Sequence, residues 1–326
     1  MRILAGSVLA LVGSVTAAHG QLSARVQRTY EEFELLAPHR AFAITADGRA
    51  YVASRSTGAD PARAVERVLK ICEERNQANC SLHAINNVVL AGRDWKSAAP
   101  PLLPAIGRLR PQFYWTNKGP QAATGLIVWS HGYLPGHDAT ASAPLGIVGH
   151  FTAAGYDLYR FDRDWIRDWP GDATRLANAV RHAKEMGYRR VVLAGQSAGA
   201  WVSMATAMRG APADGVISIA AAHHGQLKDM RDVSLPRSDW HQIVRGIKPG
   251  PRFVVVNFLN DDFDVGGRME DTRAAFATSG VQALVISDPE GFSGHGSGAN
   301  AAFSPKFGGC FRIFIEQGVR QGPCAP

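Results

Sequence analysis

Short, almost uninterrupted apolar runs alternate with longer segments of mixed polarity from about residue 121 to the end of the chain. The runs predict strands at 125–130, 156–161, 191–195, 215–220, 252–258 and 281–286. The segments between them predict helices at 144–154, 172–186, 198–208, 270–277 and within 302–317. Strands that are apolar on both faces are typical of a parallel sheet covered by helices on both sides, so the predicted fold class is α/β.

Two local features refine this pattern. Asp172 is a residue type that caps the start of a helix, and Gly187 is one that ends a helix. The second helix is therefore expected to begin and end at these positions. The polar stretch around Trp240 and His241 is interpreted as a loop.

A different pattern precedes residue 92. Two short alternating runs, 41–45 and 50–53, flank Asp47-Gly48 and predict a β-hairpin. Asp60-Pro61 then carries the cap and first-turn signals of a helix, and a further strand is expected from Cys80 to Leu90. These elements form a small ββαβ cysteine-containing unit. We interpret residues 21–91 as a small N-terminal module, with residues 21–37 as a short helix or a flexible lead-in.

Residues 92–120 contain five prolines and no clear periodicity, which favours a connecting segment over the surface of the next domain. The larger α/β domain is therefore expected to occupy residues 121–326.

The first residues have the pattern of a secretory signal peptide. Arg2 precedes an apolar stretch that reaches Ala18, and small residues at Ala18 and Gly20 predict cleavage before Gln21. The stretch is short for a membrane span, and an uncleaved anchor is the alternative. The prediction is a secreted or periplasmic protein with residues 1–20 as its leader and no integral membrane segment after cleavage.

The cysteines agree with an oxidising compartment. Cys72 and Cys80 are near neighbours, as are Cys310 and Cys324, so these two local disulfides are favoured among three possible pairings. No Cys-x-x-Cys motif occurs, which argues against a zinc or redox site, and we expect neither a metal nor a cofactor. The net charge of +7 falls to +6 without Arg2, and its basic residues are scattered, so nucleic acid is not an expected partner.

The candidate chemistry lies in Gly195-Gln196-Ser197-Ala198-Gly199, between a predicted strand and a predicted helix. This is the Gly-x-Ser-x-Gly nucleophile elbow in the strand–turn–helix context that it requires. Glycines two residues before and after the serine allow a close approach of strand and helix that side chains would block. An ordinary glycine-rich strand-to-helix turn is the alternative interpretation.

By this elbow, the order of the strands and the residues at the strand tips, residues from about 121 to 318 resemble the α/β-hydrolase superfamily. The resemblance implies the α/β-hydrolase fold and a catalytic triad in the order Ser, Asp or Glu, His. Of eleven histidines, only His295 lies beyond the strand at 252–258, so it is the expected base. The acid is expected just past that strand, where spacing favours Asp261, with Asp262 as the close alternative and Asp264 as a third candidate.

The same resemblance implies an oxyanion hole made of two backbone N–H groups, those of Ala198 and Tyr133. His131 is interpreted as a structural residue rather than a catalytic one. His223 and His224 follow another strand tip, where they either line the pocket or are ordinary loop residues.

The segment between the strands at 215 and 252 has some thirty residues, too few for the large cap of lipases and many epoxide hydrolases. An open cleft is expected, closer to that of dienelactone hydrolases, cutinase-like esterases or peptidase-type members of the superfamily. A serine rather than an aspartate at Ser197 argues against haloalkane dehalogenase or epoxide hydrolase chemistry. The leading hypothesis is a secreted serine hydrolase that cleaves small carboxylic esters through an acyl-enzyme. A serine peptidase and a catalytically inactive binding protein are the alternatives.

Overall fold

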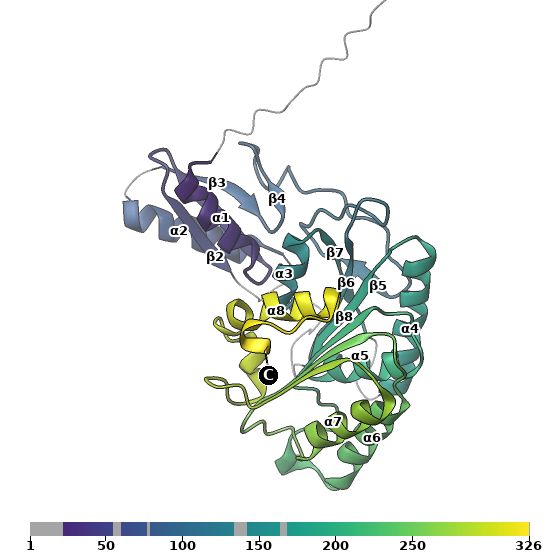
Figure 1. The fold of residues 1–326 in the computed structure, drawn as a ribbon. Coiled ribbons are helices and arrows are strands. Elements are labelled where there is room, and N and C mark those ends of the chain that lie inside the picture. The colour runs from purple at the N-terminus through teal and green to yellow at the C-terminus, as the bar shows by residue number, and fades with distance from the viewer. Residues whose placement is uncertain (1–21, 55–59, 77–78, 134–141, 164–167, 326) are drawn as a thin grey trace, which may run out of the picture.

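The computed structural model describes residues 22–54, 60–76, 79–133, 142–163 and 168–325. The expected signal peptide and its cleavage site lie outside these residues. A small N-terminal module, coloured purple to blue, adjoins a larger body built on a second sheet (Figure 1). Within the described ranges, no helix has the length and apolar character needed to cross a membrane.

The larger body is organised on a seven-stranded sheet in the order β11-β10-β9-β8-β6-β7-β5. All neighbouring strands are parallel except β5, which is antiparallel to β7 at one edge. The strands are β5 (Leu109–Pro111), β6 (Gly125–Ser130), β7 (Tyr156–Phe161), β8 (Val191–Gln196), β9 (Gly215–Ile219), β10 (Arg252–Asn257) and β11 (Ala283–Ser287). Every residue of β6 and β9 is buried, as expected for central strands covered on both faces.

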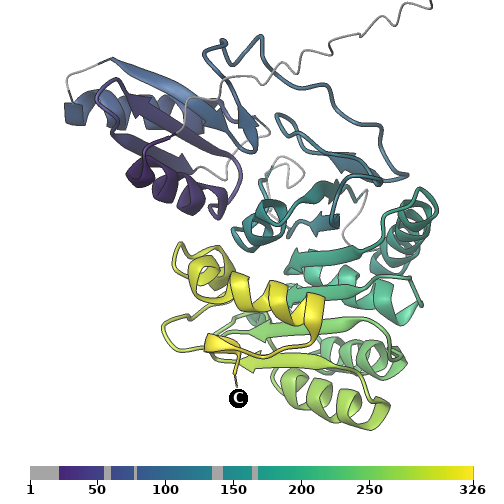
Figure 2. The ribbon, with the colours of Figure 1, turned by 45° about the horizontal axis from the view of Figure 1, so that its top comes forward.

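Helices cover both faces of this sheet (Figures 1 and 2). One face is covered by α3 (Ile147–Ala153) and α8 (Phe303–Gln317), whose apolar side chains share a core with the strands. The other face is covered by α4 (Trp169–Glu185), α5 (Ala198–Met208), α6 (Ser234–Gly246) and α7 (Arg268–Ser279). The predicted α/β class, with a mostly parallel sheet between two helical layers, is confirmed.

Three local predictions are wrong. The cap of α4 is Asp168, which accepts a hydrogen bond from the Gly171 N–H at 3.0 Å, because the helix begins earlier than Asp172. Asp172 lies buried in the first turn and accepts a hydrogen bond from Arg175 at 2.8 Å. The stretch around Trp240 is the helix α6, not a loop. The single strand expected from Cys80 to Leu90 is instead a hairpin of two strands, β3 (Cys80–Ile85) and β4 (Val88–Val89), because the chain turns at Asn86, where φ is 52°.

The N-terminal module has a four-stranded antiparallel sheet in the order β2-β1-β3-β4. Its elements are α1 (Ala24–Glu34), β1 (Arg40–Thr45), β2 (Ala50–Ser54), α2 (Ala62–Asn76), β3 (Cys80–Ile85) and β4 (Val88–Val89). The expected ββαβ order is therefore present, and the lead-in before it is the helix α1, which lies against β1 and β2.

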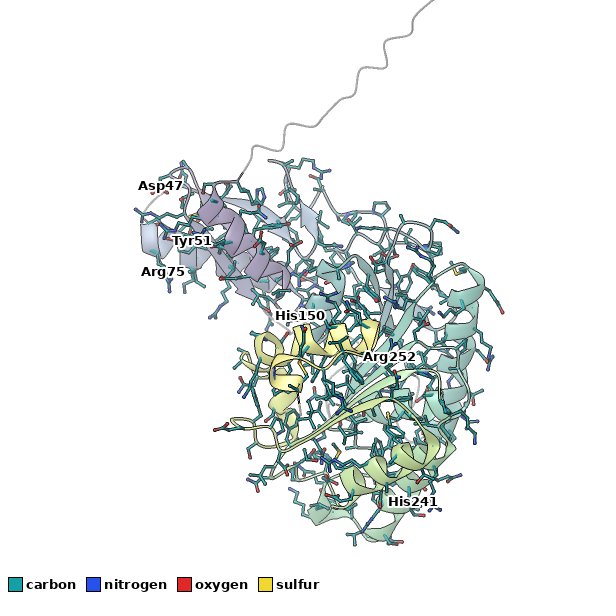
Figure 3. All side chains as sticks on the ribbon, in the orientation of Figure 1. Asp47, Tyr51, Arg75, His150, His241 and Arg252 are labelled. Atoms are coloured by element: carbon teal, nitrogen blue, oxygen red, sulfur yellow. A yellow bond between two sulfur atoms is a disulfide. The ribbon has the colours of Figure 1, made fainter. Side chains whose placement is uncertain are left out.

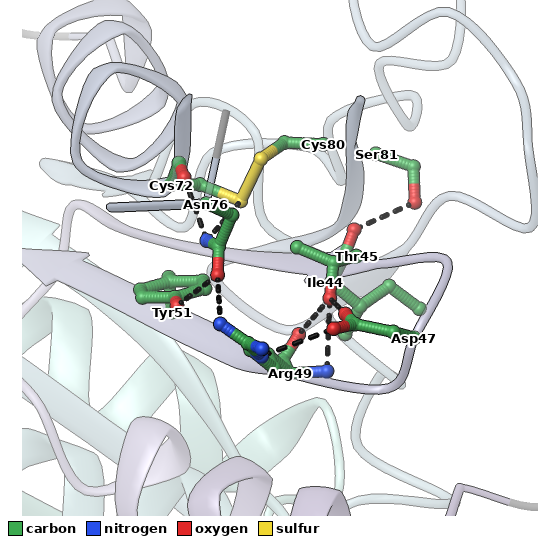
Figure 4. Close-up of a disulfide and its surroundings, with 9 residues drawn as sticks. All are labelled: Ile44, Thr45, Asp47, Arg49, Tyr51, Cys72, Asn76, Cys80 and Ser81. Atoms are coloured by element: carbon green, nitrogen blue, oxygen red, sulfur yellow. Dashed lines mark hydrogen bonds and ion pairs between the residues drawn. A yellow bond between two sulfur atoms is a disulfide. The ribbon is translucent and has the colours of Figure 1, made fainter. Parts of the chain in front are cut away.

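A disulfide between Cys72 and Cys80 joins α2 to β3 in the module. Asn76, one turn after Cys72, accepts hydrogen bonds from the Tyr51 hydroxyl at 2.8 Å and the Arg49 guanidinium at 3.0 Å (Figure 4). The second disulfide, Cys310–Cys324, ties the C-terminal segment to α8. Both disulfides follow the local pairing that the cysteine spacing favours.

The module meets the larger body where α1 contacts α3. Near this contact the Arg40 guanidinium is buried, 5.3 Å from the ring centres of both Phe33 and Trp115, and donates to the Leu36 carbonyl at 2.6 Å. Burial lowers the pKa of Arg40 to about 10, so the side chain keeps its charge at neutral pH. His150 of α3 lies close to α8, and its Nε2 is 3.1 Å from the Ser304 carbonyl oxygen (Figure 3).

Candidate active site

Ser197 occupies a strained turn between β8 and α5. Its backbone angles are φ 55° and ψ −123°, a conformation that residues with a side chain rarely adopt. Two hydrogen bonds hold this backbone to the end of β9: the Ser197 N–H donates to the Ile219 carbonyl at 3.0 Å, and the Ala222 N–H donates to the Ser197 carbonyl at 3.2 Å. The turn therefore has the geometry of a nucleophile elbow.

The two glycines of the motif are required by close packing. A Cβ atom at Gly195 would lie 2.5 Å from the backbone of Gly199, and one at Gly199 would overlap the carbonyl oxygen of Ser130 at the end of β6. Strand β8, helix α5 and strand β6 therefore meet with no space for a methyl group. The absence of side chains at both glycines is what permits this close approach.

His295 connects the elbow to a carboxylate. Its Nε2 lies 2.8 Å from the Ser197 Oγ, and its Nδ1 lies 2.9 Å from the Asp261 Oδ1. Because an ionised carboxylate only accepts hydrogen bonds, Nδ1 carries the proton and Nε2 accepts from the Ser197 hydroxyl. This is the hydrogen-bond pattern of a Ser-His-Asp triad at rest.

The structure separates the three candidate acids. The Asp261 side chain is fully buried, and its Oδ1 also accepts from the Phe263 N–H at 2.9 Å. Asp262 accepts instead from the Gln226 side chain at 2.8 Å, and Asp264 pairs with Arg268 at 2.6 Å. Of the three, Asp261 contacts His295, and its catalytic role remains a prediction.

Two further contacts hold His295 in place. The Gln196 side chain donates to the His295 carbonyl at 3.1 Å, and the Phe263 ring lies 4.1 Å from the imidazole, tilted by 32°. Sequence reasoning did not single out either residue. The position of Gln196 inside the elbow motif was a usable signal, whereas nothing in the sequence distinguishes Phe263.

The two expected oxyanion donors lie beside Ser197. Ala198 is the first residue of α5, where N–H groups lack intrahelical acceptors. Gly132 is so close to the elbow that a Cβ there would be 3.4 Å from the Ser197 Cβ, and Tyr133 follows it. Among the described residues, neither the Ala198 nor the Tyr133 N–H donates to a protein acceptor.

A cleft of about 240 Å³ opens over these groups. It brings together Ser197, His295, Ala198 and Tyr133. The residues that complete its lining are Ala222, His223, Gly225, Gln226, Asp229 and Phe263. His223 thus lines the cleft, whereas His224 does not and has its Nε2 3.0 Å from the Asp239 carboxylate. Helix α6 packs against α7 and α5, and contributes no residue to the lining of this cleft.

His131, at the end of β6, is buried and uncharged at neutral pH. Its Nδ1 lies 2.7 Å from the Gly132 carbonyl oxygen and 3.1 Å from Nη2 of Arg163. Burial, and secondarily the positive charge of Arg163, lowers the pKa of His131 to about 4. It does not contact Ser197 by hydrogen bond, in agreement with a structural role.

Among the described residues, no cluster of three or more His, Cys, Asp or Glu side chains is arranged to hold a metal ion.

The fold has counterparts among solved structures. It is similar to a putative dipeptidyl aminopeptidase IV from Bacteroides ovatus, with a TM-score of 0.50 and 13% identity over 85% of this chain and 43% of that one. Weaker similarities include a truncated carbohydrate esterase from gut microbiota (TM-score 0.47, 14% identity, 60% of this chain and 87% of that one). Another is a puromycin-hydrolyzing peptidase of Mycobacterium tuberculosis (TM-score 0.48, 14% identity, 85% of this chain and 46% of that one).

This chain spans less than half the length of the two peptidases. No protein-family model and no curated protein sequence matches it. The structural likeness, together with the sheet order and the elbow, shows the α/β-hydrolase fold that the sequence resemblance implied.

Gly199→Ala tests the packing of the elbow. We expect it to lower the free energy of unfolding by about 3 kcal/mol or more, because the added methyl group overlaps the Ser130 carbonyl. Gly296→Ala is the matched control, since its Cβ would meet no atom within 4 Å, and should change stability by less than about 0.5 kcal/mol. Urea unfolding measures both; equal stability of the two variants would contradict the close-packing argument.

The buried neutral His131 predicts a pH-dependent stability. Its pKa of about 4 in the folded state is below the ordinary 6.5, so between these values the unfolded chain binds more protons and stability rises with pH. The contribution is fully present above pH 6.5 and is lost as the pH falls towards 4. In His131→Asn, the loss of unfolding free energy between pH 7 and pH 4 should be smaller than in the wild type by on the order of 3 kcal/mol. Urea unfolding at a series of pH values measures this, and parallel curves for the two proteins would refute it.

Proposed function

We propose that this protein is a secreted serine hydrolase that cleaves carboxylic ester bonds through an acyl-enzyme intermediate. The observation that supports this most strongly is the continuous hydrogen-bonded series from Ser197 through His295 to Asp261 at the strained elbow. The fold is one on which esterases, lipases and peptidases are built, which makes hydrolysis the favoured class of reaction.

The Ser197 hydroxyl is a weak nucleophile until a base removes its proton. In the proposed mechanism the His295 Nε2 takes this proton as Oγ attacks the ester carbonyl, and it later donates a proton to the leaving alcohol. Asp261 holds the imidazole with Nδ1 protonated and stabilises the imidazolium that forms. Water then enters along the same path, and hydrolysis of the acyl-enzyme returns Ser197 to its starting state.

Negative charge develops on the carbonyl oxygen of the substrate during both steps. The N–H groups of Ala198 and Tyr133 are the proposed donors to this oxyanion. The start of α5 supports the first assignment, because the positive end of the helix dipole lies there. The position of Tyr133 in the lining of the cleft supports the second.

The proposed location is outside the cytoplasm. Two disulfides are compatible with an oxidising compartment, and the N-terminal sequence has the pattern of a signal peptide.

A fluorophosphonate probe tests the nucleophile and the acid together. We expect the probe to label the purified protein at Ser197, and Ser197→Ala to abolish both the labelling and ester hydrolysis. Asp261→Asn should lower kcat by on the order of 10⁴-fold, because it removes the group that holds the His295 tautomer. Peptide mass mapping of the adduct and steady-state kinetics are the measurements.

Asp262→Asn is the matched control for the acid, as it makes the same change at the neighbouring carboxylate. Its activity should remain within about threefold of the wild type, because an asparagine can still accept from Gln226. If Asp262→Asn is the more damaging variant, the acid is assigned to the wrong residue. Absence of any serine adduct on the wild type would support an inactive binding protein instead.

The bond that is cleaved needs a separate experiment. Peptide hydrolysis uses the same triad on the same fold, so p-nitrophenyl acyl esters and peptide p-nitroanilides should be compared at equal enzyme concentration. We expect turnover of the esters with kcat/KM at least 10²-fold above that of the anilides. A preference for the anilides would replace the esterase assignment with that of a peptidase.

A further inference from the structure

An arginine side chain contacts the loop that carries the proposed Tyr133 donor. Arg163 lies just after β7, the strand next to β6, and its Nη2 donates to the Gly132 carbonyl at 3.2 Å. The same nitrogen lies 3.1 Å from the His131 Nδ1, which is itself 2.7 Å from the Gly132 carbonyl oxygen. One carbonyl oxygen therefore has a guanidinium and an imidazole directed at it.

The Gly132 carbonyl and the Tyr133 N–H belong to the same peptide group. A trans peptide is planar, with its C=O and N–H pointing in opposite directions. Fixing the carbonyl towards Arg163 therefore turns the N–H away from Arg163. The cleft adjoins this peptide, since Gly132 lies beside Ser197 and Tyr133 lines the cleft.

We propose that Arg163 is a positioning residue for the oxyanion hole, which acts by holding the Gly132–Tyr133 peptide with its N–H directed at the reacting carbonyl oxygen. The inference rests on the proposed function. Arg163 does not touch the substrate; it acts through the Gly132 carbonyl alone.

The chemistry of the two contacting groups suits this role. A guanidinium has only donors, so it attracts a carbonyl oxygen and repels an N–H, and a hydrogen bond from a charged donor is stronger than one between neutral groups. Burial lowers the pKa of Arg163 to about 10, and the nearby carboxylates of Asp172 and Asp162 oppose that effect, so the charge is present at neutral pH. A flipped peptide would instead direct the Gly132 oxygen towards the developing oxyanion.

Two substitutions at this position separate positioning from folding. Arg163→Met removes the hydrogen bond to the Gly132 carbonyl and should lower kcat by about 10²-fold, the lower end of the effect of losing one oxyanion donor, while KM stays within about threefold. Arg163→Lys retains a charged donor and should recover part of this loss. Arg160→Gln is the matched control, because this arginine of β7 pairs with Asp162 and not with the loop; its kcat should equal that of the wild type within about threefold.

The affinity for a transition-state analogue distinguishes positioning of the oxyanion hole from a merely structural role, which would leave that affinity unchanged. A trifluoromethyl ketone forms a bond with Ser197 and places an oxyanion in the hole, whereas the matching methyl ketone binds without that charge. In Arg163→Met, affinity for the trifluoromethyl ketone should fall by the same factor as kcat/KM, and affinity for the methyl ketone should not change. Thermal unfolding shows whether each variant is folded. If Arg163→Met does not fold, the same affinities measured for Arg163→Lys test the inference.

The outcomes distinguish this inference from the proposed function. An active wild type with an unimpaired Arg163→Met, or a loss of activity without loss of analogue affinity, would overturn the role of Arg163 and leave the hydrolase intact. A wild type that neither hydrolyses esters nor reacts with a fluorophosphonate would overturn the proposed function itself.

Discussion

The arrangement of the candidate site depends on one close contact, that between the backbone of Gly199 and the carbonyl of Ser130. Because no side chain separates them, α5 begins directly against the end of β6, and the chain must turn sharply at Ser197 to enter the helix. The end of β9 holds the strained turn on its other side through Ile219. Three parallel strands thus converge on one residue. The free energy gained by packing the core exceeds the cost of the backbone strain, so Ser197 keeps its positive φ.

The same contact brings the loop after β6 next to Ser197. Gly132 lies against the elbow because Ser130, two residues before it, is already in contact with α5. The backbone N–H groups that follow Ser197 and strand β6 therefore come together as a consequence of packing alone. The proposed ester hydrolysis needs donors at that place, since the charge that develops on the substrate must be met by groups that are already oriented.

Much of the fold could be predicted because central strands have a simple signature. Strands β6 and β7 lie where their apolar runs predicted, since both faces of each are covered and few polar residues interrupt them. Helix α6 was within reach of the same reasoning, since its buried residues, Pro236, Trp240, Ile243 and Val244, recur at helical spacing among polar ones. Edge strand β5 is too short to show a period, and its pairing with β7 comes from tertiary contact. Asp172 has the same side chain as the true cap Asp168, and local sequence alone did not rank them.

The site residues, too, could be predicted only in part from the sequence. The elbow and His295 could be identified from motif and chain order, because only one histidine follows the last candidate acid. The acid itself could not be settled by spacing, since Asp261 and Asp262 are adjacent and their side chains diverge. What separates them is tertiary: Asp261 turns inward to meet His295, whereas Asp262 meets Gln226 from the segment after β9.

The two proposed oxyanion donors differ in how their directions are fixed. The Ala198 N–H is oriented by a whole helix, whose start is set by the Gly199 contact, so local side chains have little influence on it. The Tyr133 N–H belongs to a loop, where a peptide can rotate at small cost unless its carbonyl is held. In this chain the side chains of Arg163 and His131 contact that carbonyl. The sequence does not indicate this contact, because an arginine just after a strand would be expected to be exposed to solvent. One proposed donor is therefore oriented by the fold itself, and the other by side-chain contacts to its own peptide group.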